Sequence, residues 1–270
     1  MNKTSEALDP GLTESVLEKL GMTTGPALSE AGLASLYQAW CQSVPFDNIR
    51  KRIASPAHAA QPLPGATPED FFSHWLAFGT GGTCWASHGA LRALLKQLGF
   101  SIRYGISTML SQRPVSGDSP GHGTLVVRVD ETTFVIDATM LHGVPLPLAE
   151  QQHEHPVWGT HVHHSEGHWC INWKPLGRPA LDCRLLDFDA PWCEYARRHE
   201  ASRHNSRFDG ALLIRRAGQE SITGIVKGKC VTRHLDGSET FSALTHKAQQ
   251  KLLIEHFGIA EEIVVRLPEA

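Results

Sequence analysis

The fold is decided by Gly81-Gly82-Thr83-Cys84-Trp85 and by the apolar-faced stretch that follows it as far as Leu98. A glycine pair lets the backbone approach a neighbouring segment closely. The spacing after it predicts a helix over residues 84–98 that ends at Gly99. Cys84 then lies in the first turn of this helix, where the helix dipole and free N–H groups favour negative charge. A cysteine after glycines is, by itself, more often a small core residue.

Helical patterns fill the chain before this point, and strand patterns follow it. Amphipathic spacing and capping residues predict helices over residues 12–20 and 29–41, another from Pro68, and one over 245–257. Period-two patterns predict strands over residues 103–107, 124–129, 133–137, 211–216, 221–229, 230–234 and 263–267, with a hairpin turn at 235–238. Helices followed by strands and then a mixed tail predict an α+β fold rather than a Rossmann-like alternation.

Two further residues fit a catalytic role beside Cys84. His122 stands immediately before the strand over residues 124–129, and Asp137 closes the apolar run Phe134-Val135-Ile136. If these strands are antiparallel neighbours, His122 and Asp137 meet at the same end of a hairpin. An aspartate beside a histidine fixes its tautomer and stabilises the imidazolium. The set predicts a Cys84–His122–Asp137 triad, although each residue taken singly is also explained as a core cysteine, a loop histidine or a strand cap.

Bulk composition excludes several classes of protein. The 270 residues are 41% hydrophobic and 20% charged, with a formal net charge of -3, which is ordinary for a folded soluble protein. Nothing in this charge predicts binding to nucleic acid or to an anionic membrane. The first twenty residues lack a secretory signal pattern, and no apolar run approaches a membrane span. Six cysteines without a C-x-x-C pair predict reduced thiols in the cytoplasm and no structural zinc site.

One histidine-rich stretch leaves two readings open. Residues 153–168 form a polar, loop-like segment that also contains Glu154 and Glu166; its histidines are His153, His155, His161, His163, His164 and His168. Imidazole and carboxylate groups bind zinc. No helical i, i+4 pairing is visible, so a polar connection over a barrel mouth is favoured and no metal is predicted. Trp158, Trp169 and Trp173 would then line a substrate cleft.

At these residues the chain resembles the arylamine N-acetyltransferases. His122 follows Cys84 by 38 positions and Asp137 follows His122 by 15, and both spacings look like those of the family. The other similar segments are Val44-Pro45-Phe46-Asp47-Asn48-Ile49, Gly81-Gly82-Thr83-Cys84, residues 95–100, and Phe257-Gly258-Ile259.

The resemblance implies a three-part fold with a cysteine-protease-like triad arrangement. A helical domain carrying the nucleophile would span residues 1–99, a central antiparallel β-barrel 100–195, and a C-terminal α/β lid 196–270. It also implies a ping-pong acyltransferase with no tightly bound cofactor. Cys84 would take an acyl group from acetyl-CoA or another acyl-CoA and pass it to an amine or hydroxylamine. Asn205, Ser206 and Phe208 fall where the family places cofactor contacts, although a plain loop explains them equally.

Three departures from the family pattern surround the nucleophile. Thr80 stands where the family usually has arginine, and Ala86 and His88 stand where it has an acid and an asparagine. After Asp137 the family has a glycine-containing run, and this chain reads Ala138-Thr139-Met140. A charged pair that is lost together leaves no buried charge alone. The departures keep other acyl donors and acceptors open.

The rival functions share the same triad. One is an amide-forming acyltransferase that uses another thioester, including one bound to an acyl carrier protein. Another is a cysteine hydrolase, in which water replaces the amine. A catalytically silent binding protein is the third, and the presence of all three triad residues weighs against it.

Overall fold

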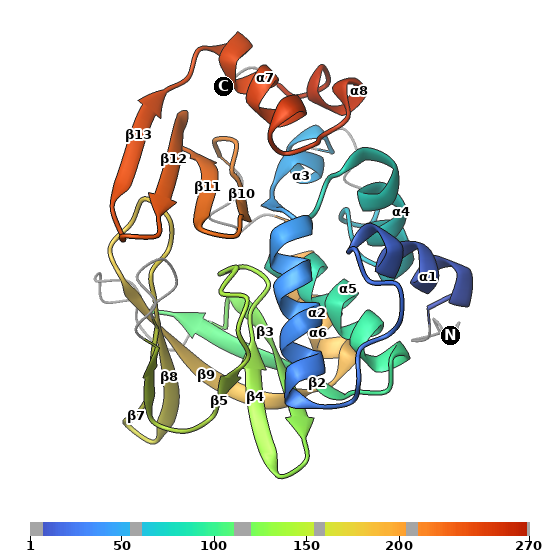
Figure 1. Ribbon diagram of the computed structural model, residues 1–270, viewed down its shortest axis with the longest axis vertical. Coiled ribbons are helices and arrows are strands. Elements are labelled where there is room, and N and C mark those ends of the chain that lie inside the picture. Colours follow the sequence, from blue (N-terminus) through green and yellow to red (C-terminus); the bar gives the residue numbers. More distant parts are fainter. Residues whose placement is uncertain (1–7, 55–60, 111–119, 154–159, 204–209, 269–270) are drawn as a thin grey trace.

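The computed structural model describes residues 8–54, 61–110, 120–153, 160–203 and 210–268. Helices from the N-terminal third lie against one side of a large curved sheet, and a smaller sheet with the last helices lies at the C-terminal end (Figure 1). This arrangement confirms the α+β class: N-terminal helices, a central antiparallel barrel sheet, and a C-terminal unit of sheet and helix. Within the described residues, no helix is both long and apolar enough to cross a membrane.

The predicted helices of the N-terminal third are all present. Side chains cap them as the sequence suggests: Ser29 accepts the Gly32 N–H, and Thr67 accepts the Asp70 N–H just before Pro68. Such caps satisfy N–H groups that the helix leaves free. The helices of this region are α1 (Pro10–Lys19), α2 (Glu30–Ser43), α3 (Ile49–Ile53), α4 (Pro68–Phe78) and α5 (Cys84–Gln97).

The larger sheet is antiparallel throughout. Within the described residues it has eight strands in the order β5-β4-β3-β2-β9-β8-β7-β6. Its strands are β2 (Ser101–Met109), β3 (His122–Val129), β4 (Thr132–Ile136), β5 (Leu146–Pro147), β6 (Gln151–His153), β7 (Thr160–Ser165), β8 (His168–Trp173) and β9 (Leu181–Ala190). After β9 comes helix α6 (Trp192–Ala201), which the sequence analysis did not predict.

The prediction of a loop-like connection over residues 153–168 was wrong where the chain is described. Strands β7 and β8 pair there, from His161 opposite Asn172 to Ser165 opposite His168. In β7 the buried Val162 alternates with outward-facing histidines, a period of two that the polar composition concealed. Trp173 is buried in the apolar cluster of this sheet and Trp169 packs against it, whereas Trp158 lies outside the described residues. The described residues contain no group of three metal-ligating side chains.

The smaller sheet combines one strand from the N-terminal third of the chain with strands from its C-terminal part. Its strands are β1 (Phe46–Asp47), β10 (Ile214–Ala217), β11 (Ser221–Val226), β12 (Lys229–His234) and β13 (Glu239–Ala243), in the order β1-β10-β11-β12-β13. Helix α7 (His246–Glu255) follows. The prediction of a strand over residues 263–267 was wrong, because helix α8 (Glu261–Val264) occupies that segment. Its β-branched residues suggested a strand, but Glu261 and Glu262 begin a helix that buries Ile263 and Val264.

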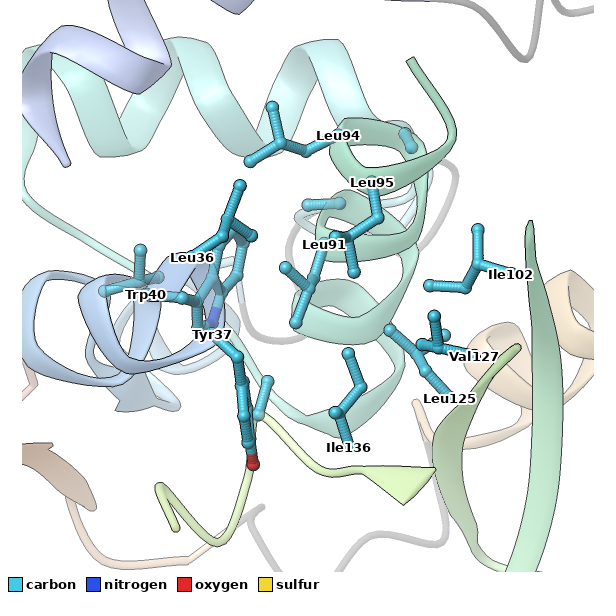
Figure 2. Packing of buried hydrophobic residues seen from close by; sticks show 14 of the residues in the cluster. Leu36, Tyr37, Trp40, Leu91, Leu94, Leu95, Ile102, Leu125, Val127 and Ile136 are labelled. Carbon is cyan, nitrogen blue, oxygen red and sulfur yellow. The ribbon is translucent and has the colours of Figure 1, made fainter. Parts of the chain in front are cut away.

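One apolar core fixes α5 between α2 and the sheet. Figure 2 shows Leu36, Tyr37 and Trp40 of α2 facing Leu91, Leu94 and Leu95 of α5. On the other side of α5 lie Ile102, Leu125, Val127 and Ile136 from β2, β3 and β4 (Figure 2). Burying each such leucine contributes about 2 kcal/mol. The packing therefore holds the first turn of α5 in place against the strands that carry His122 and Asp137.

Candidate active site

Cys84 is the first residue of α5 and only 3% exposed. The loop before it requires glycine at position 81 and leaves little room for a side chain at position 82. A Cβ on Gly81 would lie 1.8 Å from the Pro45 carbonyl oxygen, and one on Gly82 would lie 3.0 Å from the Ala86 Cβ. Thr83 at the N-cap makes no capping hydrogen bond with its side chain. The helix therefore starts at the sulfur-bearing residue, with N–H groups of its first turn uncapped by that side chain.

His122 and Asp137 are brought together by the β3–β4 hairpin. His122 begins β3, and Asp137 follows the last residue of β4. The Nε2 of His122 lies 2.6 Å from Oδ2 of Asp137, and both side chains are buried. Cys84 lies near this ring: a Cβ on Gly123, next to His122, would lie 2.9 Å from the Trp85 side chain, next to Cys84, and Cys84 helps to raise the pKa of His122. Because Asp137 engages Nε2, the nitrogen that remains for Cys84 is Nδ1.

The charges of this pair stabilise one another. Burial alone would lower the pKa of His122, but the negative charge of Asp137 and its hydrogen bond raise that pKa well above its usual value. Burial alone would raise the pKa of Asp137, but the charge of His122 and its hydrogen bond hold that pKa well below its usual value. The arrangement favours an imidazolium between a carboxylate and a sulfur.

Asp137 is held in place by further hydrogen bonds. Its Oδ1 accepts the Thr139 N–H at 2.9 Å. The Tyr37 hydroxyl of α2 donates to the Asp137 carbonyl at 2.8 Å and accepts the Asp137 N–H at 3.1 Å. These contacts orient the carboxylate toward His122 and leave it little freedom to turn away. Tyr37 is 100 residues away in sequence, so no local pattern could have indicated its role.

His88 lies one turn after Cys84, where the family pattern has asparagine. Its side chain is fully buried, and its Nε2 accepts the Ala138 N–H at 2.8 Å. Because a backbone N–H can only donate, Nε2 of His88 is an acceptor in this contact. The 3.4 Å between this nitrogen and Asp137 Oδ1 therefore separates two acceptors and is not a hydrogen bond. His88 therefore fixes the backbone beside Asp137, a positioning task that a side-chain amide oxygen can also perform.

Helix α6 supplies an aromatic wall that the sequence analysis missed. The Tyr195 ring stacks on Tyr104 at 4.1 Å between ring centroids and meets Trp85 edge-on at 4.9 Å. A Cβ on Gly123, next to His122, would lie 2.5 Å from the Tyr195 hydroxyl. The glycine therefore allows the aromatic wall to approach the histidine. Pro191 before Glu194 was the available signal for a helix start here.

The acid of the Pro45-Phe46-Asp47 segment supports the glycine loop. The Gly81 N–H donates to Oδ2 of Asp47 at 2.6 Å, and the Ile49 N–H donates to Oδ1 at 2.9 Å. Burial raises the pKa of Asp47 to about 6, although these two N–H groups and the charge of Arg50 oppose the rise. Arg50 itself is paired with Asp70, because its Nη2 donates to both carboxylate oxygens of Asp70 at 2.9 Å. Among the described residues, Asp47 therefore has hydrogen bonds and a distant cation but no arginine of its own.

The structure thus brings Cys84, His122 and Asp137 to one corner of the molecule. Asn205, Ser206 and Phe208, predicted as cofactor contacts, lie outside the described residues. A buried cysteine at a helix N-terminus, close to a histidine that an aspartate orients, is an arrangement suited to nucleophilic acyl transfer.

Comparison with known proteins agrees with this fold. The N-acetyltransferase family model matches residues 31–172, which is more than half of the 270 residues. The chain therefore belongs to the arylamine N-acetyltransferase family. A comparison with curated protein sequences gave no match.

Three solved structures illustrate how far the likeness of fold extends. Mycobacterium smegmatis arylamine N-acetyltransferase matches with a TM-score of 0.81 and 15% identity, covering 97% of this chain and 98% of that one. The Mycobacterium marinum enzyme in complex with CoA gives a TM-score of 0.80 and 13% identity, covering 95% of both chains. The Salmonella typhimurium enzyme gives a TM-score of 0.79 and 16% identity, covering 96% of this chain and 98% of that one. At these identities the likeness is one of fold.

Proposed function

We propose that the protein transfers an acyl group from a coenzyme A thioester to an amine or hydroxylamine through a thioester on Cys84. The observation that carries the proposal is the 2.6 Å hydrogen bond between His122 and Asp137, close to Cys84 at the first turn of α5. Membership of the arylamine N-acetyltransferase family supports it, as does the CoA bound to the Mycobacterium marinum relative.

The first half-reaction loads the enzyme. His122 holds the proton of the Cys84 thiol, and the sulfur attacks the thioester carbonyl carbon. The carbonyl oxygen becomes an oxyanion, for which the uncapped N–H groups of the first turn of α5 are suitable donors. When the carbon–sulfur bond to coenzyme A breaks, the leaving thiolate takes the proton from His122. One thioester is exchanged for another, so this step is close to isoenergetic.

The second half-reaction transfers the acyl group from Cys84 to the amine. The amine nitrogen attacks the carbonyl carbon of the Cys84 thioester while His122 accepts a proton from that nitrogen. The carbon–sulfur bond to Cys84 then breaks, and the amide or hydroxamate product leaves. Asp137 remains ionised throughout and stabilises the imidazolium that forms in each half. Buried surroundings at Cys84 and His122 disfavour water as the competing acceptor.

The decisive experiment is to record intact mass after incubation with acetyl-CoA and longer acyl-CoA thioesters, without an acceptor. We expect the wild type to gain one acyl group, and Cys84→Ala to gain none. The matched control is Cys193→Ala, because Cys193 is an exposed thiol on which non-enzymatic acylation would appear. That variant should keep the adduct.

Other outcomes would contradict the proposal or favour one of the alternative functions. An adduct on Cys84→Ala but not on Cys193→Ala would contradict Cys84 as the nucleophile. Loading only from an acyl carrier protein would indicate an amide-forming acyltransferase with a carrier-bound donor. Turnover of the loaded enzyme at equal rates with and without amine would indicate a hydrolase.

A further inference from the structure

Arg215 is a buried cation close to the loop that precedes the nucleophile. It lies on β10 opposite Phe46 of β1, and its guanidinium covers the Phe46 ring at 4.6 Å from the centroid. Phe46 in turn forms a bridge with Gly82, two residues before Cys84. Arg215 is 8% exposed, and its charge acts on both Cys84 and Asp137. The arginine is therefore part of the surroundings in which acyl transfer would occur.

No acid of the described chain neutralises this arginine. Its Nε has no hydrogen-bond partner among the described residues, and none of their carboxylates forms an ion pair with it. Asp137 acts on it only as a distant charge, because that carboxylate is engaged by His122 at 2.6 Å. The nearby charges that lower its pKa belong to Arg178 and Arg233.

Arg233 on β12 is a buried arginine of the same sheet that has a full set of hydrogen-bond partners. It is 5% exposed, and its Nε donates to Glu239 Oε1 at 2.9 Å. Its other nitrogens donate to the carbonyls of Lys174 and Pro175 at 2.7 Å and 2.9 Å. Arg215 is as deeply buried but, within the described chain, has none of these partners. A buried charge with no carboxylate partner among the described residues is costly to stability, and the carboxylate of a bound substrate would supply that partner.

The sheet is built to admit the Arg215 side chain. Gly224 lies directly opposite it on β11, and a Cβ on Gly224 would come 2.9 Å from the Arg215 Cβ. Burial, together with Arg178 and Arg233, lowers the pKa of Arg215 to about 10. The guanidinium therefore still carries its charge at neutral pH. Its planar fork suits the two oxygens of a carboxylate.

We propose that Arg215 binds the carboxylate of an anionic substrate while that substrate reacts at Cys84. The inference rests on the proposed acyl transfer for the identity of the reactants, because the carboxylate belongs either to the acyl group or to the accepting amine. The geometry that carries it is the burial of a guanidinium against Phe46, whose strand pairs with Gly82 two residues before the nucleophile, with no carboxylate partner among the described residues. Arg215 is thus a specificity-determining residue for a class of substrate.

A purely electrostatic role makes a different prediction. If the charge of Arg215 only stabilised negative charge on Cys84, its removal would slow neutral and anionic reagents by the same factor. If it binds a carboxylate, the loss is confined to anionic reagents. The ratio of the two rates separates these roles, whatever the absolute reactivity of the variant.

The test uses iodoacetate and iodoacetamide, which alkylate thiols alike but differ in the carboxylate. The rate of alkylation at Cys84 is followed by peptide mass, which distinguishes this thiol from the exposed Cys193. The ratio of the iodoacetate rate to the iodoacetamide rate is then divided by the same ratio for free cysteine. We expect Arg215→Met to lower this ratio on the order of 10- to 100-fold. Arg215→Lys should retain much of the wild-type ratio.

The matched control is Arg216→Met on the same strand, because the Arg216 guanidinium donates to the carbonyls of His256 and Phe257. That variant should leave the ratio unchanged.

An unchanged ratio in Arg215→Met, with a melting temperature close to wild type, would overturn the proposal. The alkylation test does not require turnover, so it remains decisive if no acyl-CoA loads the enzyme and the proposed function fails.

Two further comparisons find where the carboxylate resides. One sets succinyl-CoA against butyryl-CoA in the loading reaction, and the other sets 4-aminobenzoate against 4-aminobenzamide as acceptor. Selective loss in Arg215→Met with succinyl-CoA assigns the carboxylate to the acyl group, and selective loss with 4-aminobenzoate assigns it to the amine. Equal losses in every pair would overturn the role in substrate selection.

Discussion

Asp137 and Asp47 are buried to the same extent, each 1% exposed, yet they ionise in opposite ways. The pKa of Asp137 is held well below its usual value by His122, whereas burial raises the pKa of Asp47 to about 6. Both accept two hydrogen bonds at their carboxylate oxygens. The difference is a contacting cation, which Asp137 has and Asp47, among the residues described, lacks. Hydrogen bonds to N–H groups therefore hold a loop in place, but a paired charge is needed to keep a buried carboxylate firmly ionised.

The largest expected effect comes from removing the charge of Asp137. Asp137→Asn leaves the shape of the side chain but deprives His122 of its orienting anion, so we expect the rate of Cys84 acylation to fall about 10³- to 10⁴-fold. Stopped-flow or quenched intact-mass measurements of the loading step would show this. Asp47→Asn is the matched control, and its rate should fall less than about tenfold, because the amide oxygen can still accept one backbone N–H. Similar losses in the two variants would remove the distinction between them.

A second effect concerns how stability depends on pH. Because the pKa of Asp47 is raised from its ordinary 3.8 to about 6, its contribution to stability is fully present below pH 3.8 and is lost as the pH rises through 6. At about 1.4 kcal/mol per pH unit, the loss is about 3 kcal/mol. The amide of the Asp47→Asn variant does not titrate. Part of this loss falls below pH 4, so we expect the wild type to lose about 2 kcal/mol relative to Asp47→Asn between pH 4 and pH 7, measured by urea unfolding.

Asp137 gives the opposite slope. Its lowered pKa contributes stability that is present above pH 3.8 and is lost only as the pH falls through the folded-state value. In the comparison of wild type with Asp47→Asn this contribution is common to both proteins and cancels. A free-energy difference that does not change between pH 4 and pH 7 would show that Asp47 is not the group whose pKa is raised.

The sequence alone was enough for features that sit at the ends of local elements. Cys84 begins a helix, His122 begins a strand and Asp137 follows one, so periodicity and turn residues were enough to place all three at boundaries. The hairpin between β3 and β4 then brings the last two together with no long-range information. The same local logic placed the helices of the N-terminal third and most strands of the smaller sheet.

Features that depend on contacts between distant segments could not be predicted. Tyr37 bonds to Asp137 across 100 positions, and Arg215 lies against Phe46 only because β10 pairs with β1. Neither contact leaves a periodic signal. The strand expected over residues 263–267 failed for a related reason: Ile263 and Val264 are buried by packing in the apolar cluster of Leu253, Phe257 and Ile259, which a helix also achieves. Propensity is overridden where tertiary packing offers another way to bury the same side chains.

The smallest expected effect compares two hydroxyls beside the two aspartates. Thr80, next to the loop that Asp47 supports, and Thr139, which donates its N–H to Asp137, are both buried. In the described structure neither Oγ1 has a hydrogen-bond partner. Replacing a buried, unsatisfied hydroxyl with a methyl group removes a desolvation cost. We expect Thr80→Val and Thr139→Val each to raise the free energy of unfolding by about 1 kcal/mol, measured by urea unfolding at pH 7. The rate of Cys84 acylation should not change in Thr80→Val. A lower stability in either variant would mean that its hydroxyl is hydrogen-bonded in solution.

If only Thr80→Val were destabilised, the hydroxyl at the family's arginine position would be supporting the Asp47 loop. The contrast in ionisation between Asp47 and Asp137 would then be smaller than their pKa values indicate.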